Sequence, residues 1–199
     1  MDRAGIAEQF LTVGTHALYA YESACGVHVG TEALATRDVD LLYDTRKHVA
    51  FVTSLQRLNS SLLGIFRKAD KTFRVRPDPS QTAVNDEGFE IDVIRRQAVD
   101  ADPHSLPMSD LEDDLWAVQI PSGNPLVSDR RHEQVVVSAR GDMALMRTVH
   151  PLDFVRIKTA LAKTPGRDPL KRPKDAALQA QVVQHLWHEY LVHLNRDGD

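Results

Sequence analysis

The stretch ATRDVDLLYD, residues 35–44, is typical of a short buried strand, yet it carries two carboxylates on one face. Leu41 and Leu42 are typical of such a strand. Side chains alternate between the two faces of a strand, so Asp38 and Asp40 leave the same face. Two ionised carboxylates at this spacing repel each other. A bound cation removes that repulsion, which makes this strand the first candidate for a functional site.

A third carboxylate lies in GFEIDVIRR, residues 88–96, where FEIDVI is predicted to form another strand. Asp92 projects from that strand, and Glu90 shares its face. Two or three carboxylates around a small space suit Mg²⁺, a hard cation that takes oxygen ligands. A metal pair ~3.5–4 Å apart can activate an attacking oxygen while it stabilises the leaving one. We therefore expect a two-metal Mg²⁺ site at Asp38, Asp40 and Asp92, and for Glu90 a solvated or salt-bridged side chain is favoured over a ligand.

Gly14-Thr15 is a turn between the predicted strand FLTV, residues 10–13, and a helix predicted from Thr15 to Ala24. Backbone N–H groups at the start of a helix can hold phosphate. The plainer alternative is that Gly14 only permits a tight turn. Both readings place the glycine between the first strand and the first helix.

The rest of the pattern indicates an α+β portion followed by a helical portion, with a boundary near His150. DPSQTAVNDEG, residues 78–88, is rich in turn residues and is expected to be a link. Further helices are predicted at Ala4–Gln9, Arg46–Phe66, Pro151–Lys163 and Ala176–Leu194. Further strands are predicted in TFRVRP, LWAVQI, QVVVSA and DMALMRTV. The last two of these strands are expected to form a hairpin that turns at Arg140-Gly141.

Composition narrows the class of protein. The net charge of −4 over 199 residues gives no strong signal for a nucleic-acid partner. No run of 18 apolar residues is present, so we expect no membrane partner. The single cysteine, Cys25, excludes an internal disulfide framework and indicates a reducing compartment. These features together predict a cytoplasmic protein.

With VGT, RDVDLL and EIDVI in this order, the sequence resembles the nucleotidyltransferase superfamily, which has a polymerase-beta-like fold. VGTHALYAYE followed by TRDVDLLYD looks like a bacterial branch whose glycine turn reads GT-x-AL. The resemblance covers about residues 10 to 95. It implies a small mixed sheet flanked by helices, with a catalytic domain at 1–149 and a C-terminal helical region at 150–199.

The resemblance implies Mg²⁺-dependent transfer of a nucleotidyl group from an NTP to an acceptor hydroxyl on a protein, an RNA end or a small molecule. Asp38 and Asp40 would be metal ligands, with Asp92 as the third ligand and as the base for the acceptor hydroxyl. In this superfamily the helical region often closes over the nucleotide. Candidate phosphate contacts there are Lys158, Lys171 and Lys174, for the last two of which a solvated loop is an equal alternative.

Two other functions stay open on the sequence. A metal-dependent nuclease would use Asp38, Glu90 and Asp92, but Val93 and Ile94 stand where such sites commonly carry a lysine. A degenerate nucleotidyltransferase would bind nucleotide as a regulatory module without turnover. Thr15, which replaces the superfamily's usual Gly or Ser, keeps that alternative open.

Overall fold

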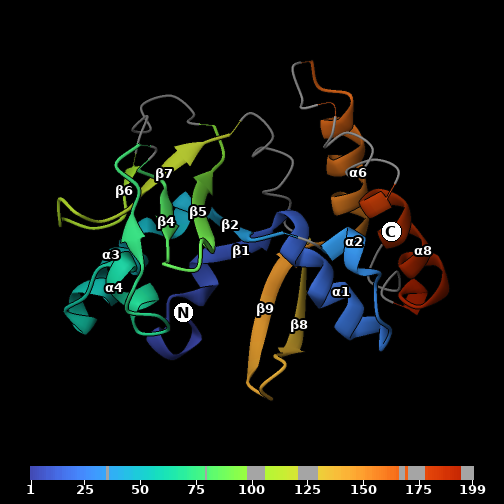
Figure 1. Ribbon diagram of the computed structural model, residues 1–199, viewed down its shortest axis with the longest axis horizontal. Helices are drawn as coiled ribbons and strands as arrows, with labels where there is room; N and C mark the ends of the chain where they lie inside the picture. Colours follow the sequence, from blue (N-terminus) through green and yellow to red (C-terminus); the bar gives the residue numbers. More distant parts are fainter. Residues whose placement is uncertain are drawn as a thin grey trace. The chain divides into compact units, whose positions relative to one another are not determined.

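The computed structural model describes residues 1–34, 36–78, 80–97, 106–120, 130–165, 169 and 178–193. Contacts group the chain into a first unit, Met1–Gly14 with Arg37–Val127, and a second unit, Thr15–Thr36 with Ser128–Asp199. Figure 1 labels the helices and strands of both units, and their mixture confirms the predicted α+β class. The grouping assigns no function to either unit, so the division into a catalytic domain at 1–149 and a helical region at 150–199 stays a prediction.

The first unit is built on a mixed sheet in which β2 lies between β1 and β5. β2 pairs antiparallel with β1 and parallel with β5. β4 runs antiparallel to β5, and β3 antiparallel to β4, while β7 pairs with the end of β5 and with β6. The bounds of these strands are β1 Phe10–Val13, β2 Asp38–Tyr43, β3 Arg74–Val75, β4 Thr82–Val84, β5 Glu90–Arg95, β6 Leu106–Pro107 and β7 Trp116–Gln119.

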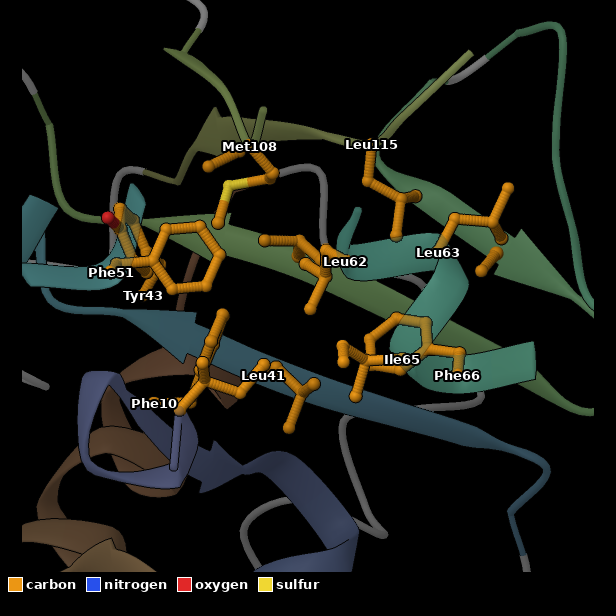
Figure 2. Packing of buried hydrophobic residues seen from close by; sticks show 14 of the residues in the cluster. Phe10, Leu41, Tyr43, Phe51, Leu62, Leu63, Ile65, Phe66, Met108 and Leu115 are labelled. Carbon is orange, nitrogen blue, oxygen red and sulfur yellow. The ribbon is translucent and has the colours of Figure 1, made fainter. Parts of the chain in front are cut away.

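One face of this sheet is buried against the helices α3 (His48–Leu58) and α4 (Leu62–Arg67). Figure 2 shows the packing, in which Phe51 of α3 lies near Phe10 and Tyr43 of the strands. The alternate residues of β2 and β5 enter this core. The cluster therefore fixes which face of the sheet remains for polar side chains. Its strand members are Phe10, Leu41, Tyr43, Ala83, Val93, Leu106 and Ala117.

The single helix predicted over Arg46–Phe66 is wrong, because the chain breaks between α3 and α4. Asn59 adopts a left-handed conformation with φ of 46° and ends α3. Ser61 then caps α4 by accepting a hydrogen bond from the Gly64 N–H. The apolar spacing continues across this break, which explains the prediction.

Two other local predictions also needed correction. The helix expected at Ala4–Gln9 consists of two short 3₁₀ turns, η1 (Asp2–Ala4) and η2 (Ala7–Gln9). The supposed link at residues 78–88 contains strand β4, whose register with β5 pairs Thr82 with Asp92. Turn residues surround this three-residue strand, so its alternation was too short to read. Pairing with β5 determines its conformation.

The second unit combines a β-hairpin with helices. Strands β8 (Arg131–Val137) and β9 (Met143–Val149) are antiparallel and confirm the predicted hairpin, with Gly141 at φ +84° in its turn. No helix in the described part of the chain is long and apolar enough to cross a membrane. The described helices of the unit are α1 Ala17–Cys25, α2 Thr31–Leu34, α6 Pro151–Ala162 and α8 Gln181–Glu189. The short 3₁₀ turn η3, Gly14–His16, precedes α1. In the first unit, the 3₁₀ turn η4, Thr45–Lys47, precedes α3.

Tyr21 is the central side chain of the second unit. It is fully buried, and its hydroxyl donates a hydrogen bond of 2.7 Å to the carbonyl of Val149 on β9. Its ring packs edge-on against Phe154 of α6 and beside His132 of β8, with centroid distances of 5.5 Å for each. One residue thus joins α1, the hairpin and α6.

Asp114 caps α4 from a distant loop. Its two carboxylate oxygens accept hydrogen bonds from the N–H groups of Leu62 and Leu63, at 3.0 and 2.9 Å, and Ser109 donates a third at 2.6 Å. A carboxylate at a helix N-terminus satisfies orphan donors and complements the helix dipole. Only 3% of Asp114 is exposed. The loop is therefore held to the helix by a buried charge.

We predict that Asp114→Ala lowers the free energy of unfolding by about 3 kcal/mol, because buried donors lose a charged acceptor. Urea unfolding followed by tryptophan fluorescence measures the change. Asp113→Ala is the matched control, since Asp113 is exposed, and it should change the free energy by no more than about 0.5 kcal/mol. Equal effects of the two substitutions would contradict the capping role.

Burial lowers the pKa of His132 and of His150 in the second unit. Below about pH 6.5 the unfolded chain takes up protons that these folded histidines do not, so stability falls as pH falls. We predict a decrease in the free energy of unfolding from about pH 7 to about pH 5, with a shallower slope in His132→Gln. Urea titrations at three pH values test this, and an unchanged slope in the variant would assign the decrease to other groups.

Candidate functional site

Strands β2 and β5 bring four acidic residues onto one face of the first unit's sheet. In their parallel register Asp38 lies opposite Glu90, and Asp40 lies opposite Asp92. The alternate residues of both strands pack into the hydrophobic core, so the acidic side chains leave the opposite face. We call this surface the carboxylate face and define it by these four residues. The structure thus brings together two pairs of acids that the sequence placed on two separate strands.

Gly14 lies against the carboxylate of Asp40. It follows β1, whose Val13 pairs with Asp40, and it has a φ of +66°. A Cβ atom built at Gly14 would stand 2.2 Å from Oδ2 of Asp40. Glycine fits this position best, because an added Cβ would force the Asp40 carboxylate to move and would also strain the backbone at its positive φ. The turn and the metal-ligand candidate are therefore direct neighbours.

Thr82 of β4 fixes the orientation of Asp92. Its hydroxyl donates a hydrogen bond to Oδ1 of Asp92, directly across the β4–β5 register. Thr82 is 3% exposed, so water does not compete for this bond. Thr82 was not predicted as a site residue, because residues 78–88 were expected to form a loop that links two strands. The alternation of Thr82 and Val84 around Ala83 was the only available signal.

Glu90 forms an ion pair at one end of the carboxylate face. Nη2 of Arg76 lies 2.5 Å from Oε1 of Glu90. The side chain of Arg76 is 43% exposed and that of Glu90 is 27% exposed, so solvent screens the attraction. The salt-bridged side chain favoured from the sequence is thus the state that the structure contains.

Thr15 belongs to the second unit and follows Gly14 directly in the turn η3. Its hydroxyl oxygen accepts a hydrogen bond of 3.1 Å from Nε2 of Gln179. Gln179 is 164 residues away along the chain, and no motif in the sequence pointed to it. The Thr15 side of the Gly14-Thr15 turn is therefore held by Gln179, while phosphate contact at this turn stays a prediction.

The three predicted lysines are placed only in part. Lys158 lies on α6 and is 7% exposed, with its Nζ 5.6 Å from the centroid of the Phe154 ring. Lys171 and Lys174 lie outside the described residues. Contact of any of these lysines with a nucleotide stays a prediction.

The donor chemistry of the carboxylate face fits Mg²⁺, because this hard cation takes carboxylate oxygens. Adjacent strands set the backbones of Asp40 and Asp92 about 4.8 Å apart. Among the residues that the structure describes, however, no three His, Cys, Asp or Glu side chains form a group ready to hold a metal ion. The backbone therefore places the donors, and their side chains would have to converge on an ion as it binds.

Comparison with known proteins assigns the chain to a family. A family model described as Nucleotidyltransferase matches residues 1–198, which is nearly the whole chain. No curated protein and no solved structure matches the sequence. The match agrees with the resemblance carried by the Gly14 turn, the Asp38-x-Asp40 strand and the strand of Asp92. The chain therefore belongs to the nucleotidyltransferase family, a family of transferase enzymes.

Proposed function

We propose that this chain transfers a nucleoside monophosphate from an NTP to an acceptor hydroxyl in a Mg²⁺-dependent reaction at the carboxylate face. The observation that carries the proposal is the position of Gly14 against Asp40, which itself stands opposite Asp92. The turn at Gly14, where we propose that phosphate binds, thus lies beside two carboxylates of the first unit. We further propose that this unit has the nucleotidyltransferase-like fold that the resemblance implies.

In the proposed reaction, Asp38, Asp40 and Asp92 would hold Mg²⁺, which when bound would neutralise phosphate charge and polarise the α-phosphate. Gly14 presents backbone without a side chain, so the triphosphate approaches the turn closely. Positioning and charge neutralisation supply most of the rate enhancement. The β2–β5 register, in which Asp40 lies opposite Asp92, supports the roles proposed for the acids.

Asp92 is proposed as the base for the acceptor. The Thr82 hydroxyl occupies Oδ1 of Asp92, which orients the carboxylate and leaves Oδ2 for the acceptor proton. As that proton transfers, the acceptor oxygen bonds to the α-phosphorus, and the bond from the α-phosphorus to the oxygen that bridges the α- and β-phosphates breaks. Pyrophosphate leaves with the electron pair of that bond.

The nuclease alternative is weakened by one contact. It needs Glu90 as a metal ligand, whereas Glu90 is engaged with Arg76 at 2.5 Å. A nucleotide-binding regulatory module would keep the carboxylate face and lose turnover. The two alternatives are therefore separated from the proposal by what happens to the NTP.

The direct test incubates the protein with each of the four α-³²P-labelled NTPs and Mg²⁺, together with candidate acceptors. The acceptors are the protein itself, a protein fraction, total RNA and a panel of hydroxylated small molecules. We expect label on one acceptor class and release of pyrophosphate, both abolished by EDTA. Binding of NTP without transfer to any class would favour the regulatory module, and cleavage of RNA or DNA without NTP would favour the nuclease.

We predict that Asp40→Asn reduces nucleotidyl transfer at least about 100-fold, because a metal ligand and its charge are lost. Its melting temperature should be unchanged or raised, since repulsion with Asp38 is relieved. Radiolabel transfer and thermal unfolding measure the two effects. Asp86→Asn is the control, because Asp86 is an exposed acid of the same unit, paired with Arg74. An Asp40→Asn protein that is unfolded would indicate a structural carboxylate instead.

We also predict that Gly14→Ala impairs both activity and stability, because its Cβ would overlap Oδ2 of Asp40. Gly5→Ala is a matched control. Gly5 has a φ of +65°, and nothing lies within 4 Å of its added Cβ, so it reports backbone strain alone. That strain costs about 1–2 kcal/mol. Urea unfolding and label transfer should show a larger loss of stability in Gly14→Ala and a loss of transfer in that variant only. Equal behaviour of the two variants would remove the argument from close approach.

A further inference from the structure

Gln179 is a buried amide that connects two segments of the second unit. It lies in a π-helical turn at residues 178–180, just before α8, and is completely inaccessible to solvent. Its Nε2 donates to the carbonyl of Ala33 at 2.8 Å and to Oγ1 of Thr15 at 3.1 Å. Thr15 directly follows Gly14, and Ala33 lies shortly before the strand that begins at Asp38. One side chain therefore holds the two segments that lead away from Gly14 and toward Asp38.

The chemistry of these partners fixes the orientation of the amide. A backbone carbonyl only accepts hydrogen bonds, so the amide nitrogen, and not the oxygen, must face Ala33. The second hydrogen of the same nitrogen is then directed at Thr15. The hydroxyl of Thr15 must accept that bond, and its own hydrogen is left for another acceptor. Gln179 thus makes Thr15 a hydrogen-bond donor at the turn.

The other end of the amide is not arranged for stability. Oε1 of Gln179 is buried and has no hydrogen-bond partner among the described residues. An unsatisfied buried acceptor is costly and needs an explanation other than stability. An apolar side chain of similar length would avoid that cost, but it would leave the carbonyl of Ala33 without this donor and could not orient Thr15. The bond to Ala33 holds the amide in place, and the bond to Thr15 is the one that suits a positioning role.

We infer that Gln179 is a positioning residue for nucleotide binding, which orients the Thr15 hydroxyl to donate to a phosphate oxygen of the NTP. The inference rests on the proposed function, because it requires that the Gly14-Thr15 turn receives the triphosphate. Gln179 does not contact the nucleotide and acts only through Thr15. Its effect must therefore disappear when the Thr15 hydroxyl is removed.

A double-mutant cycle on the full chain tests this dependence. Calorimetry with Mg²⁺ and each of ATP, GTP, CTP and UTP first identifies the NTP that binds most tightly to the native protein. The affinity of that NTP is then measured for Gln179→Met, Thr15→Val and the double variant. We expect Gln179→Met to weaken binding about 3- to 10-fold, the range for one neutral hydrogen bond. In the Thr15→Val background, the same substitution should have no further effect.

Two controls keep the result interpretable. Gln181→Met changes an exposed glutamine at the start of α8 and should bind the NTP with native affinity. Gln179→Asn keeps the amide but is one methylene too short to reach both partners, and it decides the test if Gln179→Met does not fold. We expect Gln179→Asn to weaken binding as well.

Three outcomes would overturn the inference. Native affinity in both Gln179→Met and Gln179→Asn would remove the positioning role while leaving the proposed function intact. Independent losses that multiply in the double variant would mean that Gln179 does not act through Thr15. No binding of any NTP to the folded native protein would reject the proposed function itself, and the positioning role with it.

Discussion

Burial of one face of the β2–β5 pair is the constraint on which the rest of the structure depends. Leu41 and Val93 enter the core on that face, and the register between the strands is thereby fixed. A slip of one residue would exchange the faces, placing carboxylates in the core and apolar residues in water. Hydrophobic packing under α3 and α4 therefore does more than stabilise the sheet. It determines that Asp40 and Asp92 stand side by side.

The carboxylate face combines an unfavourable repulsion between like charges with a proposed chemical use. Like charges on one face are unfavourable by themselves, and the structure surrounds them with contacts that orient them. Thr82 holds Asp92, Arg76 pairs with Glu90, and the bare backbone of Gly14 lies against Asp40. Each contact comes from a different element beside the pair. Three of the four acids of the carboxylate face are thus in contact with neighbouring segments of the chain.

Patterns of neighbouring residues in the sequence predicted several strands and the β-hairpin correctly. The strands Phe10–Val13 and Asp38–Tyr43 have the bounds that their apolar alternation indicated. The hairpin of β8 and β9 also followed from its pattern and turn. Asn59 interrupts an apolar spacing that looks continuous, because its left-handed conformation is invisible to periodicity. The roles of the site residues stay predictions, although the register shows that Asp38, Asp40 and Asp92 share a face.

Long-range contacts could not be predicted in this way. Asp114 lies in an acidic run that resembles a solvated surface, yet it caps α4 from 52 residues away. Thr82 gains its meaning only from the register with Asp92, and Gln179 only from its contacts with Thr15 and Ala33. Apart from the short alternation around Ala83, the neighbouring sequence does not mark these residues. They are determined by tertiary packing, which a single sequence does not display.

The central claim is that the carboxylate face beside Gly14 is where metal and triphosphate meet. A crystal structure of the protein with Mg²⁺ and a non-hydrolysable NTP tests it most directly. The account predicts metal density between the carboxylates of Asp40 and Asp92, with the phosphates against the backbone of Gly14-Thr15. A nucleotide bound elsewhere, with no metal at these carboxylates, would contradict the account.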